Sequence, residues 1–316
     1  MYQFETEQKV CEVGGVKFGG QPGDYPTVVC PSIFQKGDKV FGGKRKEGFD
    51  EKKAEELLKT MDKLIVETGV TGMADIVGNT GKELASYVDF VTSVSDMPFC
   101  IDAWKMKPKL EGAAYCAEKG LLDRMFYNSV TVWEEDLETE IREMSQIGVK
   151  HVLLVSFDMA DQMPSGRISG TQKLLDAIDK VGAKFESIFV DTSVMNGPAT
   201  AFCGIANRMI KEKWGFPGAS APSNGSYMWK RARELWGFAG WSAADAGLES
   251  LAAFLYHDMI FAGPMAGAPR IFPAVAMADA FLASAVFAET KRLPKDPNHP
   301  LYKLFPDFVE QLKSIG

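Results

Sequence analysis

Short apolar runs recur at an almost constant interval along this chain, and this interval restricts the fold more than any other feature. The runs that begin at positions 73, 99, 125 and 152 start 26, 26 and 27 residues apart. Such a step accommodates one strand, one helix and two short loops, which is a βα unit. Eight candidate strands of this kind occur, at 27–33, 73–77, 99–102, 125–128, 151–157, 188–191, 216–220 and 258–262.

Segments with helical spacing of apolar residues separate most of these candidate strands. They occur at 52–67, 81–94, 110–119, 134–147, 171–181 and 200–213. Eight alternating units predict a closed (β/α)8 barrel, the TIM barrel, and a chain of 316 residues is long enough for one. A doubly wound open sheet is the main alternative, but no glycine-rich dinucleotide fingerprint follows the first candidate strand. We therefore predict a single barrel domain over residues 1–316.

Three segments lie outside the repeating units. Residues 1–26 form an N-terminal extension in which 7–11 and 16–18 flank Gly14 and Gly15, a pattern typical of a hairpin that could plug the amino-terminal mouth of the barrel. The glycine- and lysine-rich stretch 35–49 predicts a mobile loop on the functional face. Residues 290–316 predict a final outer segment, with one helix over 300–315.

Charge and composition favour a cytoplasmic protein that binds neither nucleic acid nor membranes. The formal net charge is -7, and no block of basic residues offsets it. The five cysteines are spread out and form no C-x-x-C pair, which is typical of reduced thiols. The start of the chain does not resemble a signal peptide, and the apolar stretch 274–288 is too short to cross a bilayer and contains Asp279.

Several kinds of catalytic site find no support in the sequence. The three histidines, His151, His257 and His299, lie far from one another and from cysteines, so no metal site is expected. No G-x-S-x-G elbow and no P-loop occurs, which disfavours a serine nucleophile and nucleotide hydrolysis.

Polar side chains instead follow four of the apolar strands, at the point where each strand ends. They are Asp102, Asn128, Asp191 and Ser220, the last followed by Ser223, Asn224 and Gly225. The carboxyl ends of parallel strands are where ligands bind in α/β proteins. A strand-terminal acid or amide can also cap the next helix, which is the structural alternative at any single position. Four such positions together favour a ligand site.

Amides and carboxylates suit a flat heterocycle that carries both donors and acceptors. Asn128 and Asn224 offer both kinds of group, and the aspartates offer acceptors. A 2-amino-4-oxo-pterin presents such an edge, and its polar groups would be costly to bury without partners.

These residues carry a resemblance to the pterin-binding barrels, among them dihydropteroate synthase and the corrinoid-dependent methyltransferases. The stretches 19–28 (GGQPGDYPTV) and 127–130 (YNSV), with the units around them, resemble the H subunit of the tetrahydromethanopterin S-methyltransferase family. The resemblance covers nearly the whole chain. The resemblance to soluble bacterial members of this family implies that the chain transfers a methyl group from a methylated corrinoid protein to N5 of tetrahydrofolate.

The resemblance also implies roles for individual residues. Asp102 and Asp191 would hold the pyrimidine edge, and Asn128 would complete it, with Ser220 nearby. Asn224 would contact the pterin near N5, so Asn224 and Asn128 are the candidate catalytic residues. Supporting contacts are expected from Asp75 and Asn79, and the corrinoid side of the mouth is expected to include Ser156, Asp158 and Asn196.

The methyl donor is expected to arrive on a partner. No Asp-x-His-x-x-Gly carrier motif occurs, so methylcobalamin would be carried by a separate corrinoid protein. A homodimer is also expected, and Met265, Phe272 and Met277 are either its contact or ordinary core.

Two other functions remain open. A dihydropteroate synthase would need cations for a diphosphate, which Lys230, Arg231 and Arg233 could supply unless they form a solvated helix face. A non-catalytic protein would only dock the corrinoid carrier.

Overall fold

A closed barrel of eight parallel strands forms the centre of the molecule, as predicted. The computed structural model describes residues 2–41 and 48–315. The last strand pairs with the first and closes the sheet, while a two-residue strand, β4 (Thr71–Gly72), makes an additional pairing with the first. The barrel strands, in order around the sheet, are β3 (Val28–Ile33), β5 (Ala74–Val77), β6 (Phe99–Asp102), β7 (Met125–Thr131), β8 (His151–Val155), β9 (Ser187–Asp191), β10 (Gly218–Ser220) and β11 (Met259–Pro264).

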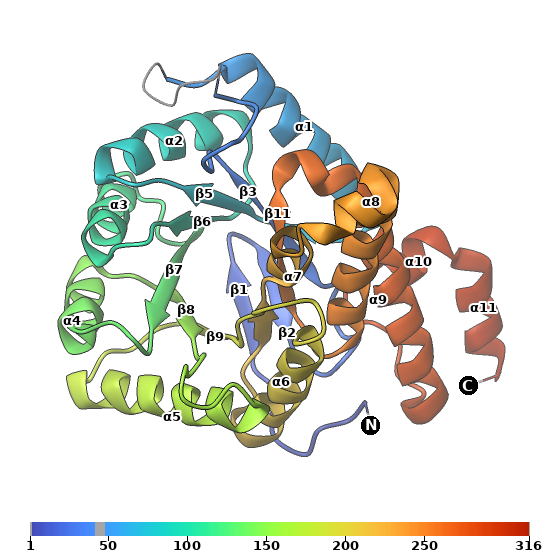
Figure 1. The fold of residues 1–316 in the computed structure, drawn as a ribbon. Helices are drawn as coiled ribbons and strands as arrows, with labels where there is room; N and C mark the ends of the chain where they lie inside the picture. The colour runs from blue at the N-terminus through green and yellow to red at the C-terminus, as the bar shows by residue number, and fades with distance from the viewer. Residues whose placement is uncertain (1, 42–47, 316) are drawn as a thin grey trace.

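Helices surround the barrel as an outer ring (Figure 1). The predicted helix 81–94 has those bounds in the structure, whereas α3, α4 and α5 begin at other residues than predicted. The helices of the ring are α1 (Glu51–Thr68), α2 (Gly81–Val94), α3 (Met106–Glu118), α4 (Leu137–Ile147), α5 (Pro164–Val181), α6 (Thr200–Trp214), α8 (Arg231–Phe254) and α9 (Ala268–Thr290). The short helix α7 (Pro222–Met228) lies inside this ring against β11 and α8, and the 3-10 turn η2 (Met265–Gly267) precedes α9.

Helix α2 begins with a capping group of its own. The Thr80 hydroxyl accepts a hydrogen bond from the Glu83 N–H at 3.1 Å, and the Glu83 carboxylate accepts one from the Asn79 N–H at 2.8 Å. Asn79 is exposed and also donates its side-chain amide N–H to Glu83. The expected supporting role of Asn79 in the ligand site is therefore wrong, because this side chain belongs to the start of α2.

The N-terminal hairpin closes one end of the barrel, as predicted, although its first arm runs over Val10–Val13 (β1) instead of 7–11. It pairs with β2 (Val16–Gly19) across Gly14 and Gly15, whose φ values of 56° and 82° are those of a two-residue hairpin turn. Phe18 is fully buried and its ring lies 5.0 Å from that of Phe189 inside the barrel. The backbone N–H groups of Lys9 and Gly14 donate hydrogen bonds to the carbonyls of Gly215 and Asp123, which lie in loops that precede strands. These bonds fix the hairpin to the barrel.

Side chains alternate between the inside of the barrel and the helix layer, as strand geometry requires. One buried cluster contains the hairpin residues together with Val28, Cys30, Met73, Cys100, Phe126, Leu153, Phe189, Ala219 and Met259. A second cluster contains their strand neighbours, such as Val29, Ile101 and Ile260, packed on the helices. The first cluster fills the interior, so it identifies which positions of each strand face inward. All five cysteines are free and buried.

The C-terminal segment differs from the prediction of one helix. It forms two short helices, α10 (Pro300–Leu304) and α11 (Pro306–Ile315), which lie outside α9 (Figure 1). Pro306 has no N–H to donate to a continuing helix and restricts the residue before it, so the chain breaks there. The segment is anchored by Asp24, which forms an ion pair with Arg292 at 2.7 Å and another with Lys295 at 2.9 Å.

One helical stretch is longer than the apolar run noted in the sequence. Residues Met265–Thr290 have the length and composition of a membrane-crossing helix, with a mean hydropathy of 1.9. The prediction that this apolar run is too short to cross a bilayer is therefore wrong. In the structure 56% of the most apolar part of this stretch is buried inside the protein, and helix α9 packs on α8 and α1. Met265 and Phe272 are core residues, whereas Met277 is 54% exposed, so only Met277 of the three is available for a dimer contact.

The predicted loop 35–49 lies partly outside the described residues, since 42–47 are not among them. Of its described part, Phe41 and Phe49 pack with Phe34, which directly follows β3.

Candidate functional site

A group of polar side chains lies inside the barrel at the carboxyl ends of its strands. Each follows an inward-facing apolar residue by two positions, so alternation directs it into the interior. The strands that contribute are β3, β5, β6, β7 and β9. We call this group the mouth cluster, and its members are Ser32, Asp75, Asp102, Asn128 and Asp191.

The members of the mouth cluster converge across the barrel. The Asn128 amide donates a hydrogen bond to Asp75 Oδ1 at 3.2 Å, although β7 and β5 are separated in the sheet by β6. Ser32 pairs with Asp75 in register, and Asp102 pairs with Asn128. Asp75, Asp102 and Asn128 therefore share one space, as the sequence predicted. Asp191 lies on β9, and its Oδ1 accepts the Ser193 N–H at 2.6 Å.

Burial dominates the acid–base behaviour of the three carboxyl groups. It raises the pKa of Asp102 to about 6, against the opposing effect of the Lys109 ammonium. Burial raises the pKa of Asp191 to about 6 as well, although the hydrogen bond from the Ser193 N–H and the positive charge of Arg167 both lower it. The pKa of Asp75 is raised well above its usual value by burial and by the neighbouring Asp102 charge. At pH 7 the cluster thus offers two carboxylates beside a carboxyl group that holds its proton more strongly.

A buried ion pair supports the β6–β7 side of the cluster from the helix layer. Lys109 on α3 and Glu140 on α4 are almost fully buried and lie 2.9 Å apart. The Tyr127 hydroxyl donates to Glu140 at 2.7 Å, and Lys109 donates to the carbonyl of Ser129, directly after Asn128. The pair therefore holds the Tyr127 side chain before Asn128 and the Ser129 carbonyl after it, and it places a positive charge near Asp102.

A second buried cation supports Asp191. Arg167 on α5 is fully buried and donates to the carbonyls of Thr192 and Ser193, the two residues that follow Asp191, the latter at 3.0 Å. Its positive charge lowers the pKa of Asp191, although burial outweighs this effect. The sequence reasoning missed both Lys109 and Arg167.

The helix-capping alternative does not apply to the mouth cluster. The caps of the following helices are Lys105 for α3, Asp136 for α4 and Ala199 for α6, none of which is a strand-end residue. Asp102, Asn128 and Asp191 are thus free of that structural role.

Ser220 does not belong to the cluster, contrary to the prediction. Its neighbour Ala219 faces the interior, and a Cβ at Gly218 would meet Asn207 of α6, so Gly218 and Ser220 face the helices. The Ser220 side chain is fully buried, and its hydroxyl has no hydrogen-bond partner among the described residues.

The residues predicted for the corrinoid side have local roles in the structure. Ser156 is fully buried and donates to the Asp191 carbonyl at 3.2 Å, so its predicted place on the open mouth is wrong. Asp158 accepts the Ala160 N–H at 2.8 Å, and Asn196 accepts the Ala199 N–H at 3.1 Å. Both lie in loops after strand ends, and contact with a corrinoid stays a prediction for them.

Asn224 lies on α7 instead of at the end of a strand. It is exposed and lines a cleft of about 930 Å³ between the segment after β3, α1, α7, α8 and the end of β11. Asn224 therefore lies on the helix that follows β10, across the barrel from β6 and β7. We call this space the tail cleft.

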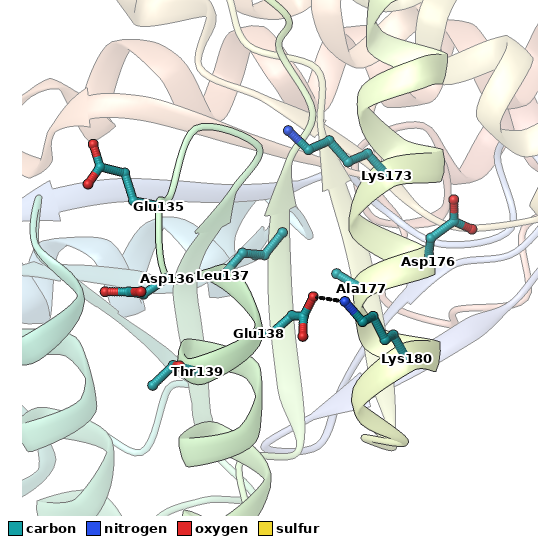
Figure 2. A pocket seen from close by; sticks show the side chains of 9 residues that line it. All are labelled: Glu135, Asp136, Leu137, Glu138, Thr139, Lys173, Asp176, Ala177 and Lys180. Carbon is teal, nitrogen blue, oxygen red and sulfur yellow. Dashed lines mark hydrogen bonds and ion pairs between the residues drawn. The ribbon is translucent and has the colours of Figure 1, made fainter.

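Another hollow, of about 460 Å³, lies between the start of α4 and α5 (Figure 2). It is lined by exposed acids and lysines, with Glu138 and Lys180 paired across it. No member of the mouth cluster lines it or is hydrogen-bonded to one of its lining residues in the described part of the chain, so it is not the candidate site. Among the described residues, no group of three or more histidine, cysteine or acidic side chains is arranged to hold a metal ion.

The strands and helices define a (β/α)8 barrel with polar side chains at its carboxyl end. Solved structures with this fold include a Yersinia pestis dihydropteroate synthase with a pterine-sulfa conjugate, at a TM-score of 0.59 and 12% identity over 88% of this chain and 100% of that one. A Xanthomonas albilineans dihydropteroate synthase with 4-aminobenzoic acid has a TM-score of 0.59 and 13% identity, over 87% of this chain and 98% of that one. At these identities the likeness concerns the fold.

The chain belongs to the family of the tetrahydromethanopterin S-methyltransferase MtrH subunit, whose model matches residues 6–291. The H subunit of this enzyme from Methanothermobacter thermautotrophicus is 32% identical over 96% of this chain and all of its own length. The corresponding protein of Methanopyrus kandleri is 32% identical over 90% of this chain and 94% of its own. The predicted family is thereby confirmed, and it is a family of methyltransferases.

Proposed function

We propose that this chain transfers a methyl group from a methylated corrinoid, carried by a separate protein, to N5 of tetrahydrofolate. The observation that carries the proposal is the mouth cluster, in which carboxylates and an amide converge inside a barrel of this methyltransferase family. The dihydropteroate synthase alternative rests on fold likeness alone, and family membership favours methyl transfer over it.

The pyrimidine end of a pterin carries a 2-amino group, a ring N–H and a carbonyl. Asp102 and Asp191 would accept hydrogen bonds from the donors of this end, and the Asn128 amide can both donate and accept. The Asn128 contact with Asp75 orients the amide before the ligand arrives. Such an arrangement lowers the cost of binding because the protein groups are already in place.

The reaction is a displacement at the methyl carbon. The N5 lone pair forms the new C–N bond, the carbon–cobalt bond breaks with its electron pair left on cobalt, and the N5 proton is released. N5 is a weakly basic amine that is already neutral at pH 7, so no strong base is needed. The chain would chiefly hold the pterin in place and exclude water, and Asn224 at the tail cleft is the candidate contact near N5.

The central test follows the visible spectrum of methylcobalamin under anaerobic conditions, free and bound to corrinoid proteins. We expect conversion to the cob(I)alamin spectrum that depends on both the chain and the pterin. Parallel reactions with tetrahydrofolate and tetrahydromethanopterin decide the acceptor, because the names of the curated relatives carry the latter. Absence of conversion with either pterin would refute the proposal.

A non-catalytic docking protein is separated from a methyltransferase by binding measurements on variants. Such a protein would bind the corrinoid carrier without any effect of Asp191→Ala or Asn128→Ala on pterin affinity. The proposed function requires a large loss of pterin affinity in both variants.

Pterin binding is expected to weaken as the pH falls below about 6, because burial raises the pKa of both Asp102 and Asp191 to about 6. Protons compete with the pterin for groups that must be ionised, so the association constant falls up to about tenfold per pH unit for each group below its pKa and levels off above it. Titration calorimetry across this range measures the slope. Asp191→Asn should remove one of the two contributions, and an affinity that is constant with pH in the unmodified chain would contradict the assigned role of these carboxylates.

A further inference from the structure

The tail cleft joins the mouth cluster at the side where the cluster has fewest acids. Ser32 of the mouth cluster donates to Gln35 at 3.1 Å, and Gln35 lines the cleft. On the other wall, Ser223 donates to the carbonyl of Phe261, which lies on β11. The acids and amide of the cluster lie on β5, β6, β7 and β9, so the cleft opens above β3, β10 and β11.

This position matches the shape of a substituted pterin. A pterin held by its pyrimidine edge on the acid side directs its other ring, with N5 and the C6 substituent, away from those acids. The substituent must then leave over the strands that border the tail cleft.

The cleft carries positive charge on an otherwise acidic protein. Its lining includes five cations and two acids, whereas the whole chain has a net charge of -7. Lys53 and Arg270 already pair with Asp50 and Asp245. The charged groups that remain are the cations Lys36, Lys39 and Arg233 and the acids Asp38 and Glu56. Arg233 forms no ion pair within residues 2–41 and 48–315, so it is the cation that stays available. An anion is therefore the favoured ligand for this wall.

The wall beside Arg233 is aromatic and rigid. The Arg233 guanidinium lies 4.1 Å from the centroid of the Trp241 ring, and Arg270 lies 5.1 Å from the same ring. Trp241 is 1% exposed and donates its indole N–H to the Ser226 carbonyl at 3.1 Å. A guanidinium stacked on an indole keeps its N–H edges available for a carboxylate or phosphate.

Arg270 completes this wall from the segment after β11. It donates two hydrogen bonds to the fully buried Asp245, at 2.9 and 2.6 Å, and one to the Tyr227 hydroxyl at 3.1 Å. A Cβ at Gly267 would lie 2.6 Å from the guanidinium, so glycine at this position leaves room for the arginine. The cleft thus combines fixed aromatic faces with an exposed arginine that has no acidic partner in the described part of the chain.

We propose that the tail cleft binds the substituent of the pterin, an aryl group followed by an anion, with Arg233 contacting the anion. The inference rests on the proposed function, since it concerns the same ligand. Tetrahydrofolate and tetrahydromethanopterin both carry an aryl group in this place, the first ending in carboxylates and the second bearing a phosphate as well.

The test compares tailed and tail-free ligands by calorimetry on the full chain. We expect Arg233→Gln to weaken the binding of tetrahydrofolate about tenfold, through loss of one charge-assisted contact, while 6-methyltetrahydropterin binds as before. Arg231→Gln is the matched control, because Arg231 is exposed on the same helix and does not line the cleft. Arg233→Lys should recover part of the affinity.

The outcomes separate this inference from the proposed function. If Arg233→Gln leaves both ligands unchanged, or weakens both equally, the inference is overturned while pterin binding stands. If the unmodified chain binds neither ligand, the proposed function falls and the inference falls with it. A parallel titration with tetrahydromethanopterin identifies the anion, since a larger loss there than with tetrahydrofolate assigns Arg233 to the phosphate.

Discussion

Asp191→Asn is expected to weaken the binding of tetrahydrofolate by about a hundredfold. The replacement removes the negative charge and presents amide hydrogens to the donors of the pterin, so charge-assisted hydrogen bonds are lost in a buried place. The asparagine Oδ1 can still accept the Ser193 N–H, which preserves the local turn. Titration calorimetry measures the affinity, and the thermal midpoint checks that the variant is folded.

Asp158→Asn is the control for this variant. Asp158 follows the neighbouring strand β8, and its carboxylate accepts a local hydrogen bond from the Ala160 N–H. Its replacement should change pterin affinity by less than about twofold, in line with a position outside the mouth cluster. Equal losses in the two variants would show that charge anywhere near the mouth, and not the mouth cluster, governs binding.

Glu140→Ala is expected to lower the free energy of unfolding by about 3–5 kcal/mol, because it leaves the buried Lys109 ammonium without its ion-pair partner. The Tyr127 hydroxyl loses its acceptor in the same change. Urea denaturation followed by circular dichroism measures the loss. Glu138→Ala, on the same helix α4, breaks the exposed pair with Lys180 (Figure 2) and should cost less than about 1 kcal/mol.

A double variant separates stability from the effect on the site. Lys109→Met with Glu140→Leu removes both charges and should restore most of the stability lost in Glu140→Ala. It also removes the cation that lowers the pKa of Asp102, so the pH midpoint of ligand binding should move upward. A double variant as unstable as Glu140→Ala would show that the ion pair itself, and not the unpaired lysine, sets the stability.

The regular spacing of strands and helices was sufficient to predict the barrel. The glycine pair at Gly14 and Gly15 predicted the hairpin, and the polar strand ends predicted most of the mouth cluster. Asp102, Asn128 and Asp191 could be found because each ends an apolar strand, and the structure shows that each also follows an inward-facing apolar residue by two positions. Ser220 was misplaced because the prediction counted strand ends and ignored alternation. The contact between Asn128 and Asp75 depends on the width of the barrel, which sequence spacing does not give.

The supporting cations could have been recognised by helical spacing. Lys109 stands four residues before Ala113 and seven before Cys116, both buried on α3, and Arg167 has the same relation to Thr171 and Leu174 on α5. A charged residue on the buried face of a helix needs a partner in the interior. What the spacing could not reveal is that both cations reach the backbone directly after mouth-cluster residues.

The hairpin at the amino end of the barrel has a consequence for the order of events. With Phe18 and its neighbours filling that end, the interior is a well that opens at the carboxyl ends of the strands. The pterin and the corrinoid carrier would have to use that same opening, so we expect the small molecule to enter first and the carrier to settle over it. The methylated product would then leave only after the carrier has departed.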